Sequence, residues 1–149
     1  MDRFHEKLNT FLAHPDVQIM GEFPQHRKSN TLAHVTRVAK RSHGIAKKLH
    51  IKVDEDSMMR GAILHDYYLY STHDMDMSAY RHVVSHAELA LKNASAKFDL
   101  NKKEENIIYS HMWPLNVTHL PRCKEAWIIS LADKICAIQE MLNFRLAVS

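Results

Sequence analysis

The chain has 149 residues, of which 46% are hydrophobic and 25% are charged, and its formal net charge is +3. A chain of this length forms one domain and can bury a core without disulfides. Only three glycines and four prolines are present, which favours long helices over a turn-rich β architecture. We therefore expect an all-α fold with a single domain over residues 1–149. The mild, dispersed charge indicates no nucleic-acid surface.

The chain shows no targeting or membrane signal. Residues 1–6 lack the basic segment and apolar run of a secretory signal peptide, and no apolar stretch approaches the ~20 residues that span a bilayer. Cys123 and Cys136 follow no disulfide or metal-binding pattern. We therefore expect a cytoplasmic protein with reduced cysteines and no membrane partner. Twelve histidines are the unusual feature of the composition. Histidine is a common metal ligand, so this number favours metal binding.

The first third of the chain predicts two helices joined by a loop. Helical spacing of apolar residues predicts a helix over residues 3–13, which ends before Pro15. A polar loop follows over residues 21–30, and we expect it to be a mobile piece over a site. Ser29 or Asn30 can cap a long helix over residues 31–50.

Three histidines of this long helix lie at different places on its surface. His34 is at the edge of the apolar stripe near the start of the helix, which makes it a candidate ligand. His43 and His50 project from the opposite face, where we expect them to be solvated.

The next helix, over residues 55–65, is capped by Asp54 and ends in the sequence AILHD at residues 62–66. His65 and Asp66 fall on its buried side, where an unpaired carboxylate would cost on the order of several kcal/mol. A divalent transition metal would offset that cost, because imidazole nitrogens and carboxylate oxygens are both good ligands. A solvated His-Asp pair at a helix end is the alternative for this dipeptide alone. An irregular segment should follow over residues 67–77.

Two further helices carry histidines beside apolar faces. In the helix predicted over residues 79–98, His82 and His86 lie one turn apart, and His86 borders the apolar stripe. Asn101 and Glu104 form a predicted capping box for the next helix, which carries His111 and stops before Pro114.

The last predicted helix, over residues 121–146, is apolar on almost all sides between residues 126 and 138. This pattern predicts the central, buried helix of the domain. Asp133 lies inside the apolar segment, and a buried aspartate in such surroundings needs a cation.

The ordered pattern H…HD…H…H…D resembles the HD-domain superfamily of metal-dependent phosphohydrolases, and small stand-alone bacterial HD-domain proteins in particular. The resemblance covers residues 31–139 and includes AILHD at 62–66, IIYSH at 107–111 and LADK at 131–134. It implies an HD-domain-like helical bundle around a buried C-terminal helix, with a core over about residues 30–146. The pattern is made by His34, His65, Asp66, His86, His111 and Asp133.

The resemblance also implies a metal centre with one or two divalent transition ions (Fe, Mn, Co, Ni or Zn). The ligands of the first ion would be His34, His65, Asp66 and Asp133. In binuclear relatives the equivalents of His86 and His111 bind a second ion and that of Asp66 bridges the two, whereas in mononuclear relatives such histidines contact substrate. His82 and His119 are further candidates to touch metal or substrate.

Three residues are candidates for a catalytic role: Asp66, Lys134 and Arg37. The two cationic residues among them would contact phosphate in the reaction. Lys134 matches a frequent family lysine after the last aspartate, and Arg37 lies one turn beyond His34; a solvated arginine is the alternative for Arg37. Tyr67 departs from the residues that follow the His-Asp pair in some relatives, and no Gly-Tyr-Pro motif is present, which argues against the phosphodiesterases that carry it. Cys136 is expected in the core.

The implied activity is attack of a metal-activated water on phosphorus. The substrate would be a small phosphorylated metabolite, a nucleotide or dinucleoside polyphosphate, so the enzyme would be a phosphomonoesterase or a phosphodiesterase/pyrophosphohydrolase. A non-catalytic HD module that binds metal or nucleotide and regulates a partner is the alternative, and a metal-stabilised structural protein is a third. The intact ligand set argues against the non-catalytic module, whereas the metal-stabilised structural protein stays open. A homodimer stays open.

Overall fold

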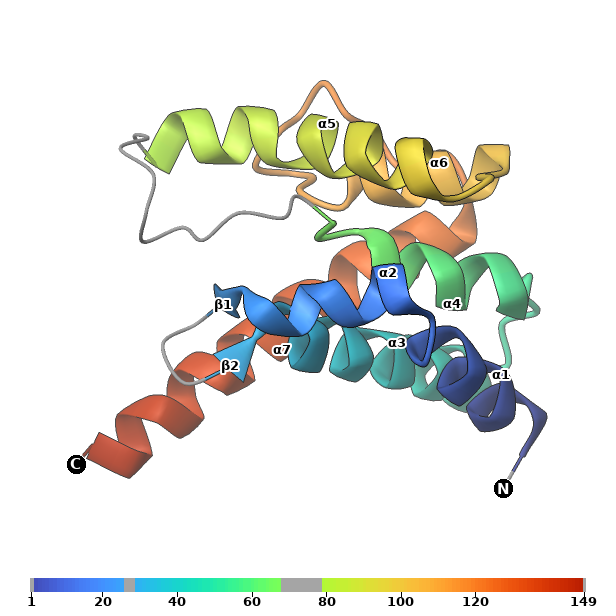
Figure 1. The fold of residues 1–149 in the computed structure, drawn as a ribbon, viewed down its shortest axis with the longest axis horizontal. Helices are drawn as coiled ribbons and strands as arrows, with labels where there is room; N and C mark the ends of the chain where they lie inside the picture. The colour runs from blue at the N-terminus through green and yellow to red at the C-terminus, as the bar shows by residue number, and fades with distance from the viewer. Residues whose placement is uncertain (1, 26–28, 68–78, 149) are drawn as a thin grey trace.

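The computed structural model describes residues 2–25, 29–67 and 79–148, and among these the side chains of residues 2–23, 30–67 and 85–143. This part of the chain is almost entirely helical (Figure 1). In chain order its elements are α1 (Arg3–Leu12), α2 (Pro15–Gln18), the 3₁₀ helix η1 (Ile19–Glu22), β1 (Pro24–Gln25), β2 (Ser29–Asn30), α3 (Thr31–Lys48), α4 (Glu55–Leu64), α5 (Ala79–Lys97), α6 (Lys102–Ser110) and α7 (Lys124–Val148). The predicted all-α fold is confirmed.

The helices form two sides with α4 between them. In Figure 1, α5 and α6 lie along one edge of the molecule and α1, α3 and α7 lie toward the other. Helix α4 packs against both α3 and α6, and α7 also contacts α3 and α6. The antiparallel pair β1–β2 joins η1 to α3. None of the helices within the described ranges has the length and apolar character needed to cross a membrane.

Three of the predicted helix starts are formed by side-chain caps. The Oδ1 atoms of Asn30, Asp54 and Asn101 accept hydrogen bonds from backbone amides three residues further on, at 2.8, 3.1 and 2.8 Å. Caps of this kind typically contribute about 1 kcal/mol each. The capping box predicted at Asn101 is only half formed, because the carboxylate of Glu104 pairs with Arg60 of α4 at 3.0 Å.

A glycine permits the close approach of α4 and α6. A Cβ atom added to Gly61 would lie only 2.7 Å from two side-chain carbons of Ile107. The two helices therefore pack closely at this point, and both end near it, at Leu64 and Ser110. The residues that follow these ends, His65 and His111, are consequently brought together, with ring centroids 4.7 Å apart.

Helix α7 is buried along one side only. Ala126, Ile129 and Ala132 are fully buried, as expected for a helix that contacts α3 and α6. Trp127 and Leu131, however, are 44% and 51% exposed, and they continue into an exposed apolar stripe with Ile138, Met141 and Leu142. The prediction of a central, buried helix is therefore confirmed for one side of α7 and wrong for this side, which no described element covers.

His43 is not solvated as predicted. It is 8% exposed, and its ring stacks on Phe4 of α1 with centroids 3.9 Å apart. Phe4 and His5, at the start of α1, both lie against the His43 ring, so a position that looks polar along α3 alone becomes a contact between two helices. Burial lowers the pKa of the His43 imidazole. His50, by contrast, is exposed as expected.

Replacing His43 with alanine should therefore destabilise the protein. Loss of the stacked ring should lower the free energy of unfolding by about 0.5–3 kcal/mol, the usual range for a single buried substitution, which urea denaturation would measure. Metal content should be unchanged, because His43 lies in neither of the ligand groups described below. Lys40→Ala, at an exposed position of the same helix, is the matched control. Equal stability of the two variants would contradict a supporting role for the His43–Phe4 stack.

Candidate metal centre

All six residues predicted to bind metal converge in the interior of the domain. They form two groups in which the potential ligand atoms lie within 4.8 Å of one another. The first group is His34, His65, Asp66 and Asp133, and the second is Asp66, His86 and His111. Asp66 belongs to both groups. Their function as ligands stays a prediction, but the geometry that it requires is present.

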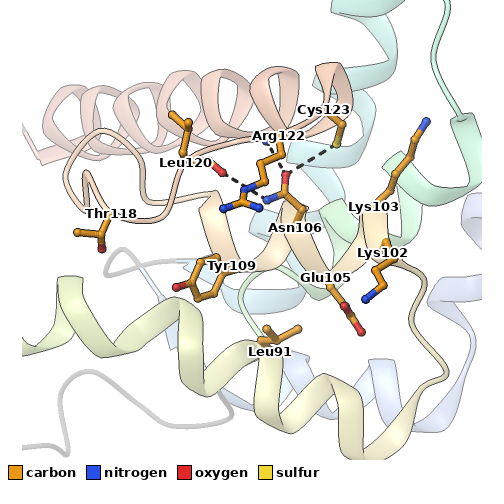
Figure 2. A pocket seen from close by; sticks show the side chains of 10 residues that line it. All are labelled: Leu91, Lys102, Lys103, Glu105, Asn106, Tyr109, Thr118, Leu120, Arg122 and Cys123. Atoms are coloured by element: carbon orange, nitrogen blue, oxygen red, sulfur yellow. Dashed lines mark hydrogen bonds between the residues drawn. The ribbon is translucent and has the colours of Figure 1, made fainter.

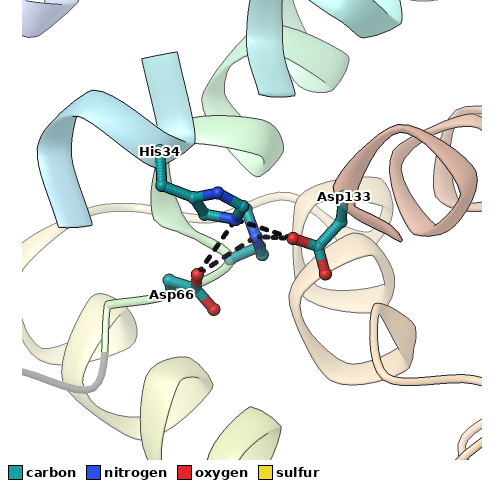
Figure 3. Close-up of side chains that lie close together, drawn as sticks. His34, Asp66 and Asp133 are labelled. Atoms are coloured by element: carbon teal, nitrogen blue, oxygen red, sulfur yellow. Dashed lines mark hydrogen bonds and ion pairs between the residues drawn. The ribbon is translucent and has the colours of Figure 1, made fainter. Parts of the chain in front are cut away.

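In the first group, imidazole nitrogens face carboxylate oxygens, and Figure 3 shows the ring of His34 beside Asp66 and Asp133. His34 Nε2 lies 2.7 Å from Asp133 Oδ1 and 3.5 Å from Asp66 Oδ2. His65 Nε2 lies 3.2 Å and 3.4 Å from the same two oxygens. These separations suit atoms that share one ion, since metal–ligand bonds of ~2.0–2.2 Å keep two ligands of the ion within about 4 Å of each other.

The second group uses the other oxygen of the same aspartate. His86 Nε2 lies 2.6 Å from Asp66 Oδ1, and His111 Nε2 lies 3.5 Å from it. His111 is completely buried, and its Nε2 atom has no hydrogen-bond partner among the described residues. An unsatisfied buried nitrogen is unfavourable, and coordination of a cation would satisfy it. The two oxygens of Asp66 therefore point to two different clusters of imidazoles.

His65 and His111 are oriented by the ends of their own helices. Each occupies the C-cap position, of α4 and α6 respectively. Each donates its Nδ1–H to the carbonyl three residues earlier, at 2.6 Å to Ala62 and 2.7 Å to Ile108. The last carbonyls of a helix lack backbone partners, so they are free to accept these bonds. A proton held on Nδ1 leaves the Nε2 lone pair available for metal.

Burial and mutual charge shift the pKa values of the cluster strongly. Burial alone lowers the pKa of His34, but its hydrogen bonds to Asp133 and Glu140 outweigh burial and raise the pKa well above the usual value. Burial raises the pKa of Asp66, but the neighbouring His65 and His86 outweigh it and hold the pKa well below the usual value. A buried cluster with such shifts is typical of a functional site. A cation that binds here must displace protons from the imidazoles.

The residues present fit a divalent transition metal. Imidazole nitrogens and carboxylate oxygens together suit Mn, Fe, Co, Ni or Zn better than Ca or Mg. The orphaned Nε2 of His111 and the fixed tautomers of two of the histidines are features of a site prepared to bind a cation.

The two cationic candidates lie outside both groups. The Lys134 ammonium donates to the carbonyl of His111 at 3.1 Å and to Oγ of Ser130 at 2.8 Å, so it ties α7 to the end of α6. The Arg37 guanidinium binds the carboxylate of Glu140 at 2.7 Å. Contact of Lys134 or Arg37 with a substrate phosphate stays a prediction.

Of the two remaining histidine candidates, His119 alone has a described side chain. His119 stacks on Tyr109 with ring centroids 3.7 Å apart, and its Nε2 lies 3.3 Å from Glu88, which places it in neither group. His82 belongs to α5, and its side chain lies outside those that the structure describes. Residues 26–28 of the loop predicted to be mobile and residues 68–77 of the predicted irregular segment also lie outside the described residues.

One residue of the site was not predicted from the sequence. Both oxygens of Glu140 lie 3.0 Å from His34 Nδ1, on the opposite side of the ring from Asp133. The available signal was spacing: Glu140 follows Asp133 by seven residues, or two helical turns, and therefore shares its face of α7.

A separate cavity lies on the outer side of α6 (Figure 2). It has a volume of about 650 Å³ and is lined by residues of α5, α6 and the segment before α7, including Tyr109, Arg122 and Cys123. The side chain of Asn106 braces it by accepting a hydrogen bond from the amide of Arg122 at 2.8 Å. No member of either ligand group lines this cavity, so it is distinct from the candidate metal centre.

Fold and site together define a helical domain built around a buried histidine–aspartate centre. A sequence model described as the HD domain matches residues 31–138, a range that contains all six predicted ligands. The chain therefore belongs to the HD-domain family, whose members are generally metal-dependent hydrolases. No curated protein and no solved structure matches the sequence.

Proposed function

We propose that this protein is a metal-dependent phosphohydrolase with a two-ion centre. Its substrate would be a small phosphorylated metabolite with a phosphodiester or phosphoanhydride bond, such as a dinucleoside polyphosphate or another nucleotide. The observation that carries the proposal is the placement of Asp66, whose Oδ2 faces His34 and His65 while its Oδ1 faces His86 and His111. A carboxylate in this position can bridge two ions.

Each residue of the centre has a distinct part. His34, His65 and Asp133 would hold one ion with Oδ2 of Asp66, and His86 and His111 would hold the other with Oδ1. Bound divalent ions lower the pKa of water and neutralise charge on a transferring phosphoryl group. Among the four residues of the first group, Asp133 has the most exposed side chain, at 15%. Substrate would therefore approach the centre from the side of Asp133.

A metal-resolved activity profile tests the proposal. Metal-free protein would be reloaded with Mn²⁺, Fe²⁺, Co²⁺, Ni²⁺ or Zn²⁺ in turn and assayed for phosphate or nucleotide release. The substrates would be nucleoside mono- and triphosphates, dinucleoside polyphosphates and sugar phosphates. At least one ion should support multiple turnovers on a diester or anhydride, and Asp133→Ala, tested in parallel, should not.

Two results would count against the proposal in different ways. Protein that binds metal but hydrolyses none of these compounds would favour a binding module that regulates a partner. Hydrolysis of phosphomonoesters alone would favour a centre with a single ion.

A further inference from the structure

Glu140 reaches His34 from the far end of the chain. It lies on α7 two residues beyond the segment that matches the HD-domain family. Both of its carboxylate oxygens are 3.0 Å from Nδ1 of His34, and the side chain is only 9% exposed. On the other side of the imidazole, Nε2 faces Asp133 at 2.7 Å. The ring is therefore held between two carboxylates of α7.

His34 differs from His65 and His111 in how its ring can be oriented. Those two residues lie at helix ends and donate Nδ1–H to a carbonyl of their own helix. His34 lies within α3, and its Nδ1 faces a side chain of another helix, the carboxylate of Glu140 on α7. The orientation of its ring therefore depends on a residue 106 positions away in the chain.

We propose that Glu140 is the positioning residue of the candidate metal centre, an inference that rests on the proposed function. By accepting the Nδ1–H of His34, Glu140 keeps the proton on that nitrogen and leaves the Nε2 lone pair for the metal. It orients a ligand without being one, because it faces the opposite edge of the ring from the first group. Outer partners of this kind typically contribute 10–100-fold to metal affinity.

Arg37 acts on the same carboxylate. Its Nε and its terminal nitrogen both lie 2.7 Å from Oε1 of Glu140, and the Arg37 side chain is 45% exposed. A purely structural role for Glu140 would consist of this ion pair between α3 and α7. In that case the loss of Arg37 and the loss of Glu140 would have equal effects, whereas the positioning role makes Glu140 the more important residue for metal binding.

The test compares metal affinity in four proteins. Affinity for Mn²⁺ and Zn²⁺ would be measured by competition with a chromophoric chelator in wild type, Glu140→Ala, Glu140→Gln and Arg37→Ala. Glu140→Ala should weaken the tighter binding step by about 10–100-fold. Glu140→Gln should lose less, because the amide oxygen still accepts a hydrogen bond, and Arg37→Ala should lose only a few-fold. Gln139→Ala, at the adjacent exposed position on α7, should match wild type.

A second readout follows the proton itself. In the diamagnetic Zn²⁺-loaded protein, the Nδ1–H of His34 should give an exchange-protected imidazole resonance in wild type and in Glu140→Gln. The resonance should be lost in Glu140→Ala, and ¹⁵N shifts of the ring would report the tautomer. If Glu140→Ala does not fold, the positioning role is tested by comparing Glu140→Gln with wild type. The two quantities compared are the metal affinity and the tautomer of the His34 ring.

The outcomes separate this inference from the proposed function. Wild-type affinity and an unchanged His34 resonance in Glu140→Ala, or equal losses in Glu140→Ala and Arg37→Ala, would overturn the positioning role and leave the metal centre intact. Failure of the wild-type protein to bind any of the ions would overturn the proposed function and this inference with it.

Discussion

Asp66→Ala should retain no metal at either group and should have no phosphohydrolase activity. The two oxygens of Asp66 face different clusters, so one substitution removes a charged ligand from both. The loss should exceed the roughly 10–100-fold that follows removal of an outer partner. Elemental analysis of protein desalted after loading with excess metal would measure retention, and circular dichroism would confirm that the variant is folded.

A conservative variant and a surface control make this expectation specific. Asp66→Asn keeps the volume of the side chain but loses the charge, so it should bind one ion at most. Asp56→Ala removes an exposed aspartate that pairs with Lys7 at the surface, and it should keep the full metal content. Two ions retained in Asp66→Asn would contradict the bridging role of this residue.

His86→Ala should lower the metal content from about two ions per chain to about one. His86 contributes to the second group alone, and its Nε2 approaches Asp66 Oδ1 to 2.6 Å, so the first group should stay intact. Hydrolysis of diesters or anhydrides should fall together with the second ion, since a two-ion centre stabilises both the attacking and the leaving oxygen. Metal-to-protein ratios under saturating metal, measured beside the activity, would check both parts.

His119→Ala is the matched control for the metal count. His119 is also a buried histidine, but it stacks on Tyr109 outside both groups, so its removal should leave two ions in place. A wild-type ratio near one that His86→Ala does not change would rule out the two-ion centre. The proposal would then move to a phosphomonoesterase with a single ion held by His34, His65, Asp66 and Asp133.

The sequence by itself determined most of the local structure. The caps at Asn30, Asp54 and Asn101 depend on contacts three residues apart, so their pattern is visible in the chain. The order and helical setting of the six candidate ligands are also local properties, since each lies at a helix end or beside an apolar stripe. For this reason the fold class and the candidate residues could be predicted from the chain, while the division of these residues into two ligand groups was implied by the resemblance to the HD-domain family.

Other features depend on which helices meet, and only the tertiary structure decided them. The burial of His43 requires Phe4 of α1. The apolar stripe of α7 is exposed because α3 and α6 pack against the other side of that helix. Periodicity along one helix reports that an apolar or polar face exists, but it does not report what covers that face.

The arrangement of the centre was likewise decided by tertiary packing. The sequence supplied Asp66, but the direction of its two oxygens follows from the close approach of α4 and α6 at Gly61 and from the placement of His86 on α5. The contact between His34 and Glu140 joins residues 106 positions apart. Hydrogen-bond geometry of this kind depends on side-chain orientations to within a few tenths of an ångström, and helical spacing does not specify these orientations. The identity and order of the candidate ligands, by contrast, can be read directly from the sequence.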